Sequence, residues 1–100
     1  LYDAQYEAVA AGRMGEELNQ QVTIAGKYCE SGDILVQGAH LPSPFPGDIL
    51  ALPASGAYAP SMASNYNLNP RPAIILVKDG KTRVLRRREE PEDMMRNDIW

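Results

Sequence analysis

The stretch Ile74-Ile75-Leu76-Val77-Lys78-Asp79-Gly80-Lys81-Thr82-Arg83-Val84-Leu85 decides the fold class. Two apolar segments rich in β-branched residues flank the dipeptide Asp79-Gly80, and this arrangement predicts a β-hairpin. A type I′ turn needs positive φ at both central residues, which aspartate and glycine tolerate. We therefore expect two antiparallel strands joined by a two-residue turn.

Outward from this hairpin, eight glycines and eight prolines divide the chain into short segments of strand length. Alternating or apolar residues predict further strands at 21–26, 33–36 and 49–52, whereas 6–11 fits either a short strand or a helical turn. Alternate prolines predict an extended loop over 38–47, and the small polar residues of 55–70 predict another loop. A short helix is expected at 90–95. The pattern predicts a mainly β domain, a β-sandwich or a partly open β-barrel with short helical segments.

The composition narrows the function classes. The chain has 100 residues, a net charge of -3 and a pI near 5.0, which argues against nucleic acid as a partner. No apolar run is long enough to span a bilayer, so no membrane role is expected. The single cysteine excludes an internal disulfide and fits a cytoplasmic setting. His40, the only histidine, lacks further ligands at metal-binding spacing, so no metal site is predicted.

The candidate functional side chains lie in the segment Cys29-Glu30-Ser31-Gly32-Asp33, which follows a predicted strand. A thiol can donate a proton when its pKa is close to the working pH, and a carboxylate can hold a substrate ammonium. The residues alone leave a second interpretation open. A lone cysteine is often a small buried hydrophobe, and Glu-Ser-Gly-Asp is often a plain surface turn.

The segment Gly26-Lys27-Tyr28-Cys29-Glu30-Ser31-Gly32-Asp33 resembles the Gly-Pro-x-Cys-Glu-Ser-Gly-Asp motif of diaminopimelate decarboxylases. Lys27 stands where that family often has proline. The resemblance continues in order along nearly the whole chain, through Leu1-Tyr2-Asp3-Ala4, Pro46-Gly47-Asp48, Gly56-Ala57-Tyr58, Ser64-Asn65-Tyr66-Asn67, Arg71-Pro72, Arg86-Arg87-Arg88-Glu89 and Glu92-Asp93. The resemblance implies that residues 1–100 are the carboxy-terminal β domain of a longer enzyme, and the start at Leu1 agrees with that expectation.

Such enzymes use pyridoxal 5′-phosphate, bound covalently to a lysine of an amino-terminal β/α barrel. They convert meso-2,6-diaminopimelate to L-lysine and carbon dioxide, the last step of lysine biosynthesis. The resemblance further implies a head-to-tail homodimer in which each active site combines one barrel with the partner's β domain. Lys27, Lys78 and Lys81 lie in no context that resembles the cofactor lysine, so the chain alone is expected to be inactive.

The same resemblance assigns roles residue by residue. Cys29 is expected to be the catalytic proton donor, and Glu30 is expected to bind the substrate at its distal amino group. Tyr58 is expected to contact both cofactor and substrate, and Tyr2 the distal end of the substrate. From the residues alone, either tyrosine could equally be half-buried packing.

Two other functions remain open at this stage. Related decarboxylases for ornithine or arginine usually carry Cys-Asp at the first motif, so Glu30 and Ser31 favour diaminopimelate. Alternatively, the chain is a stand-alone β module for binding or assembly in which the Cys29 turn is only structural. The run Arg86-Arg87-Arg88 could bind an anion, although a solvated or salt-bridged strand edge is the simpler interpretation.

Overall fold

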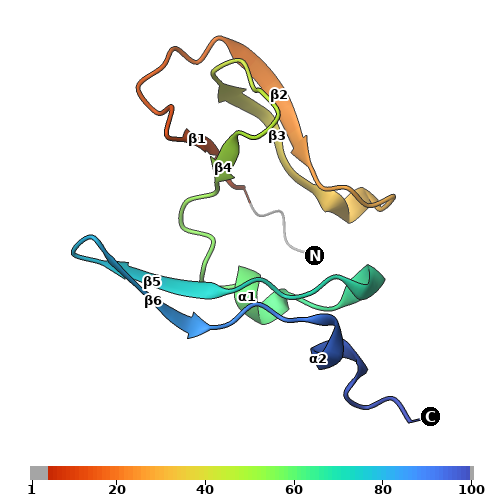
Figure 1. Cartoon of the computed structure of the whole chain (residues 1–100). Coiled ribbons are helices and arrows are strands. Elements are labelled where there is room, and N and C mark those ends of the chain that lie inside the picture. The colour runs from red at the N-terminus through yellow and green to blue at the C-terminus, as the bar shows by residue number, and fades with distance from the viewer. Residues whose placement is uncertain (1–4, 100) are drawn as a thin grey trace. The chain divides into compact units, whose positions relative to one another are not determined.

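A computed structural model of the chain describes residues 5–99 and forms two compact units, with the boundary between Tyr58 and Ala59. Within these residues the strands form three antiparallel pairs (Figure 1). In unit 1, β1 (Val9–Ala11) pairs with β4 (Ile49–Ala51), and β2 (Gln20–Ala25) pairs with β3 (Ile34–Leu41). The ambiguous segment 6–11 is therefore a strand in its second half.

The small core of unit 1 lies on one face of β3. Val36, Ala39 and Leu41 are buried there, and Leu41 is 1% exposed. Five partly buried side chains pack against them: Tyr6, Ala8, Val22, Ile24 and Leu52. Burial of this apolar surface holds the β2–β3 pair against the segments before β1 and after β4.

The predicted loop over 38–47 begins later than the sequence suggested. β3 continues through His40 to Leu41, where it pairs with Gln21 and Gln20. The prolines start only at Pro42, so the four residues before it keep the backbone N–H groups that a strand needs. Gly38 has a φ of 70° and lies at the register shift between the pairs Val22–Ala39 and Ile24–Val36.

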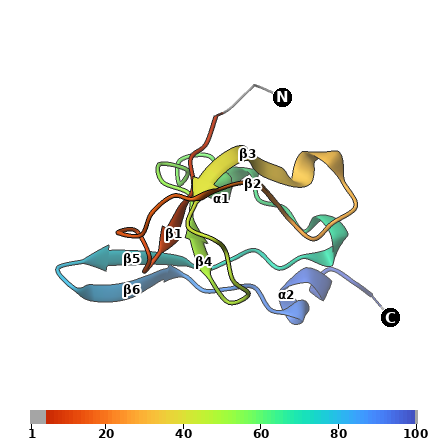
Figure 2. The ribbon, with the colours of Figure 1, turned by 90° about the horizontal axis from the view of Figure 1, so that it is seen from above.

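Unit 2 contains the hairpin that the sequence predicted. β5 (Ile74–Lys78) pairs with β6 (Lys81–Arg86), and the two strands lie side by side in both ribbon views (Figures 1 and 2). Asp79 and Gly80 have φ values of 51° and 69°. Positive φ at both positions is the signature of a type I′ turn, so the prediction is confirmed.

The region predicted as a loop over 55–70 contains two short helical pieces. These are α1 (Ala59–Met62) and a 3₁₀ turn at Tyr66–Leu68. The predicted terminal helix is α2 (Pro91–Met95), which begins after Glu90 with proline at its first position. Asp93 and Glu90 form a capping box, in which each side chain accepts from the other's backbone N–H.

The mainly β fold class is confirmed, with strands as the dominant elements and only short helices between them. The described strands form pairs and no closed barrel. Over residues 5–99, no helix has the length and apolar character needed to cross a membrane.

Candidate functional site

The Cys29 motif forms a tight turn between β2 and β3. A short 3₁₀ helix, Ser31–Asp33, follows Glu30 and leads directly into β3. The backbone N–H of Asp33 donates to the carbonyl of Glu30 at 3.0 Å. The Asp33 carboxylate accepts from the N–H of Tyr28 at 2.9 Å. Asp33 therefore bonds to the residue before Cys29 and to the residue after it, and these two bonds hold the turn together.

Gly26 is required at the base of this turn. Its N–H donates to the Asp33 carbonyl at 2.7 Å, and a Cβ added at Gly26 would overlap the Asp33 carboxylate. Only a residue without a side chain lets the two ends of the turn approach this closely. Gly26 is thus part of the turn that holds Cys29 at the surface.

Cys29 and Glu30 are both exposed on this turn. One Glu30 oxygen, Oε1, accepts from the N–H of Gly32 at 2.9 Å. This bond fixes the carboxylate over the turn while leaving it solvent-accessible. The interpretation of Cys29 as a small buried hydrophobe is therefore wrong, because its position after the end of β2 puts it outside the core.

A pocket of about 310 Å³ lies beside the motif. Its walls include Gln5 and Tyr6 from the start of the described chain, and Ser31 and Ile34 from the turn and β3. Gln5 and Tyr6 thus lie next to the Cys29 turn. Tyr2 itself falls outside the described residues, so its predicted role stays a prediction.

Tyr58 ends unit 1, directly before α1, and is 63% exposed. Like Cys29 and Glu30, Tyr58 is an exposed residue of unit 1. Across residues 5–99, no three His, Cys, Asp or Glu side chains gather as metal ligands would.

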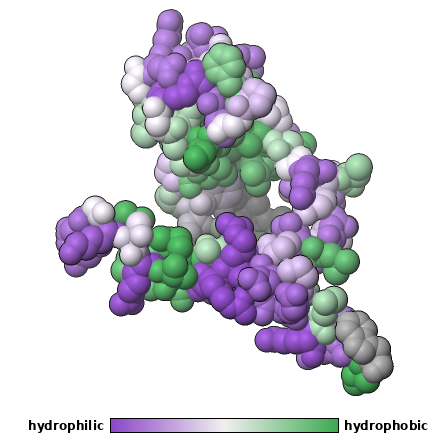
Figure 3. All heavy atoms as spheres, in the orientation of Figure 1, coloured by the Kyte–Doolittle hydropathy of each residue, from purple (hydrophilic) through white to green (hydrophobic). Residues whose placement is uncertain are grey.

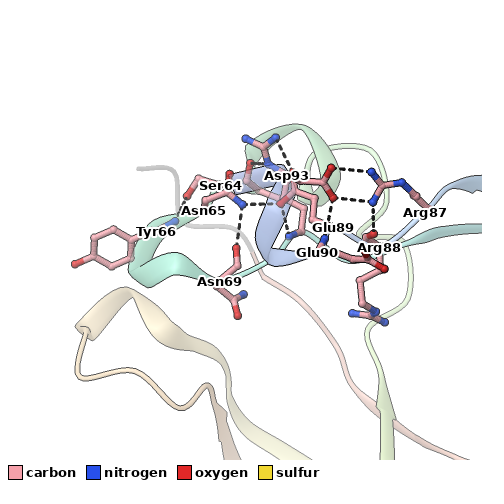
Figure 4. Close-up of polar contacts among 11 residues, drawn as sticks. Ser64, Asn65, Tyr66, Asn69, Arg87, Arg88, Glu89, Glu90 and Asp93 are labelled. Carbon is pink, nitrogen blue, oxygen red and sulfur yellow. Dashed lines mark hydrogen bonds and ion pairs between the residues drawn. The ribbon is translucent and has the colours of Figure 1, made fainter. Parts of the chain in front are cut away.

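Unit 2 contains a polar cluster that the sequence did not predict as a unit. Glu89 accepts from the Asn65 side chain at 2.6 Å and from the Arg71 backbone N–H at 2.8 Å. The Arg71 guanidinium approaches the other Glu89 oxygen at 3.4 Å. Figure 4 shows Glu89 between Asn65 and Arg87, the residue that follows β6. Three motifs quoted separately from the sequence, at 65, 71 and 89, therefore meet at one carboxylate.

These contacts change the ionisation of the carboxyl groups. Hydrogen bonds from the Arg71 backbone and the Asn65 side chain lower the pKa of Glu89 below its ordinary value. The Arg87 guanidinium, bound through two bonds of 2.7 Å, lowers the pKa of Asp93 strongly. In turn, the hydrogen bonds to Asp93 raise the pKa of Arg87. The Arg87–Asp93 pair is exposed and the Glu89 contacts are partly buried, so water screens part of both interactions.

The arginine run 86–88 is only partly a salt-bridged edge. Arg87 pairs with Asp93 and thus fits that interpretation. Arg86 is different, because its Nε and Nη2 atoms are buried and have no hydrogen-bond partner within residues 5–99. Because residues 86–88 are all arginines, the sequence gave no indication that the side-chain nitrogens of Arg86 would be buried.

Comparison with known proteins places this chain in a family. Residues 1–56, which include Cys29 and Glu30, match the model of the "Pyridoxal-dependent decarboxylase, C-terminal sheet domain". The chain belongs to this family of pyridoxal-dependent decarboxylases.

Within that family the chain is similar to diaminopimelate decarboxylases. It is 48% identical over 99 residues to the diaminopimelate decarboxylase of Bacillus subtilis, covering 99% of the chain and 23% of the relative. The Synechocystis enzyme is 48% identical over 97 residues, covering 97% of the chain and 21% of the relative. The chain thus spans less than a quarter of the length of these relatives.

Solved structures agree with the fold. The diaminopimelate decarboxylase of M. jannaschii, in co-complex with L-lysine, superposes with a TM-score of 0.85 and 34% identity, covering 99% of the chain and 22% of that structure. The Helicobacter pylori enzyme complexed with L-lysine gives 0.83 and 38% identity, covering 95% and 23%.

Proposed function

We propose that residues 1–100 are the carboxy-terminal β domain of a diaminopimelate decarboxylase, which converts meso-2,6-diaminopimelate to L-lysine and carbon dioxide. The observation that carries this proposal is the exposed Cys29–Glu30 turn, on a chain that is 48% identical to such enzymes over nearly its full length. The β/α barrel that completes the enzyme lies outside these residues.

Cys29 is the proposed proton donor. Its thiol stands at the surface of a turn held by Asp33 and Gly26, so it can meet a substrate bound by another part of the enzyme. A thiol positioned in this way returns a proton to the carbon that has lost carbon dioxide. The fixed turn limits the movement of the donor and thereby favours the productive geometry.

Glu30 is the proposed binder of the distal ammonium group of the substrate. Its carboxylate is exposed, and the bond from Gly32 restrains it beside Cys29. A charge-assisted hydrogen bond to an ammonium is among the stronger polar contacts. A carboxylate here thus distinguishes a substrate with a second amino group from one without it.

Pyridoxal 5′-phosphate, when bound, supplies the electron sink for the loss of carbon dioxide. Tyr58, an exposed residue, is the proposed contact of this chain to the cofactor and also to the substrate. Tyr2 is proposed to contact the distal end of the substrate, which agrees with the pocket that Gln5 and Tyr6 form beside Ser31. Lys27, Lys78 and Lys81 are all exposed and lie in no sequence context that resembles the cofactor lysine, so the lysine that holds the cofactor is proposed to belong to the barrel.

The complete enzyme is proposed to work as a homodimer in the cytoplasm, without nucleic acid or membrane as partners. An active site shared between subunits is consistent with exposed polar groups on a domain that lacks the cofactor lysine. Sedimentation of the full-length enzyme tests the dimer directly.

The decisive experiment replaces Cys29 with alanine in the full-length enzyme and measures lysine production from meso-diaminopimelate. General acid catalysis contributes about 10²- to 10⁴-fold, so kcat is expected to fall by that order while the melting temperature stays unchanged. Cys29→Ser, which keeps a weaker acid, is the matched control and should fall less than alanine. Unaltered turnover of Cys29→Ala would remove the proton-donor role.

A substrate comparison separates the alternatives. The full-length enzyme is offered meso-diaminopimelate, L-ornithine and L-arginine side by side. We expect diaminopimelate to be the preferred substrate. The Glu30→Gln variant should have a higher KM for diaminopimelate than the wild type. A preference for ornithine or arginine would reassign the substrate, and no turnover of any of the three would overturn the decarboxylase proposal.

A further inference from the structure

Gly32, at the centre of the 3₁₀ helix Ser31–Asp33, contacts the carboxylate that is proposed to bind the substrate. Glu30 is the residue before this helix, and its Oε1 atom accepts from the Gly32 N–H at 2.9 Å. A Cβ added at Gly32 would stand 2.8 Å from Oε2 and 3.1 Å from Oε1 of Glu30. Real Cβ atoms essentially never come within 3.0 Å of another atom in this way, so a side chain at position 32 would displace the carboxylate.

The backbone at Gly32 does not itself require glycine. Within residues 5–99 the glycines with positive φ are Gly12, Gly38, Gly47 and Gly80, and Gly32 is not among them. Alanine suits a helical backbone better than glycine does, so the local conformation would favour alanine at this position. The contact with Glu30 therefore explains why position 32 has no side chain.

The main chain of Glu30 is held independently of its side chain. The Glu30 N–H donates to the Tyr28 carbonyl at 2.9 Å, and the Glu30 carbonyl accepts from the Asp33 N–H at 3.0 Å. The position of the carboxylate therefore depends on the side-chain rotamer, which the bond from Gly32 selects. Glu30 is exposed, and hydrophilic side chains predominate at this end of the β2–β3 pair (Figure 3). Apolar packing thus contributes little to holding the carboxylate.

The bond from Gly32 leaves the carboxylate able to bind a cation. An ionised carboxylate offers about four lone-pair sites, and the Gly32 N–H occupies one of them. The remaining sites can accept hydrogen bonds from a substrate ammonium group. A side chain that is already ordered loses less conformational entropy when a ligand binds, so the restraint by Gly32 favours binding.

We propose that Gly32 is a positioning residue for substrate recognition, which sets the Glu30 carboxylate in the orientation that binds the distal ammonium group. Gly32 acts in two ways, because its N–H holds Oε1 and its lack of a side chain makes room for Oε2. The inference rests on the proposed function, which assigns the distal ammonium group to Glu30. Gly26 differs from Gly32, since the side chain missing at Gly26 makes room for Asp33 and thereby for the turn itself.

The test compares Gly32→Ala with the wild type in the full-length enzyme. The added methyl group meets the flexible end of Glu30, so the carboxylate moves while the backbone stays. We expect the KM for diaminopimelate to rise by about 2- to 10-fold, with kcat changed by less than about 2-fold. The melting temperature should not fall, because alanine restricts the unfolded chain.

Gly15→Ala is the matched control, since nothing lies within 4 Å of a Cβ added there. This variant should keep the wild-type KM. An unchanged KM for Gly32→Ala would overturn the inference. A fall in its melting temperature would also overturn it, because the glycine would then serve the turn rather than the carboxylate.

Two ligands isolate the contribution of the ammonium group. L-Lysine carries a distal ammonium group, whereas L-norleucine has the same carbon chain without it. Inhibition constants against diaminopimelate should show that Gly32→Ala binds L-lysine more weakly than the wild type does, and L-norleucine equally well. An equal loss of affinity for both ligands would contradict a role of Gly32 in ammonium recognition.

A double-mutant cycle with Glu30→Gln separates this inference from the proposed function. Glu30→Gln alone should raise the KM, and Gly32→Ala should add little to that rise, because the carboxylate to be positioned is gone. Additive effects would show that Gly32 acts without Glu30 and would overturn this inference alone. A wild-type KM for Glu30→Gln would instead overturn the proposed role of Glu30, and the inference with it.

Discussion

The carboxylate of Asp33 fills the space that a side chain at Gly26 would need, while the Gly26 N–H donates to the Asp33 carbonyl at 2.7 Å. The two residues are seven positions apart and form the base of the turn that carries Cys29. The position of the proposed proton donor therefore depends on a residue that has no functional group.

Gly26→Ala tests this dependence. The new methyl group must displace Asp33, which breaks the bond from Tyr28 and shifts the turn. We expect a loss of stability of about 1–3 kcal/mol in urea unfolding and a fall in kcat/KM of the full-length enzyme. Gly15→Ala, where nothing lies within 4 Å of the added Cβ, is the control. Equal effects of the two variants would show that the close approach is unimportant.

The exposure of Cys29 predicts its reactivity. In the isolated 100-residue chain, a thiol reagent should label Cys29 under native conditions without prior unfolding, because the side chain is exposed. In the full-length enzyme, bound substrate should slow the labelling, since the thiol then faces the substrate. Mass spectrometry after timed quenching measures both rates, and Cys29→Ser reports labelling elsewhere in the enzyme. Labelling that substrate leaves unchanged would contradict the location of Cys29 in the active site.

The hairpin turn predicts a contrast between two neighbouring substitutions. Gly80 has a φ of 69°, so Gly80→Ala forces a side chain into the left-handed region and should cost about 1 kcal/mol. Asp79→Asn keeps a residue that tolerates this region and should be neutral. Chemical denaturation of both variants gives the comparison. A neutral Gly80→Ala would argue against the type I′ geometry.

Acid should weaken unit 2 through its carboxylates. The pKa values of Asp93 and Glu89 are lowered in the folded chain. Their stabilising contribution is therefore complete above the ordinary carboxyl pKa, about 4, and is lost as the pH falls below it. Melting temperatures from pH 7 downward should drop through this range, and Asp93→Asn should flatten the drop. Glu92→Gln, exposed on the same helix, should keep the wild-type profile; identical profiles for all three proteins would refute the assignment.

The sequence by itself determined the local structures. The hairpin follows from Asp79-Gly80, because both residues tolerate positive φ. The start of α2 follows from Glu90-Pro91, because proline suits the first turn of a helix. The strand β3 was predicted too short because the influence of Pro42 was extended to residues before it, which keep their N–H groups. The resemblance carried by Cys29 to Asp33 also gave the family, which the comparison of known proteins confirmed.

Only the tertiary structure decided the contacts between distant residues. Asn65, Arg71 and Glu89 meet because the chain reverses at the β5–β6 turn, and no property of the single residues predicts which carboxylate will collect them. Likewise, Arg86 and Arg87 are adjacent and chemically equal, yet one pairs with Asp93 and the other has two buried, unpaired nitrogens. Local preferences act through bonds along the chain, whereas pairing and burial depend on the path that brings separated segments together.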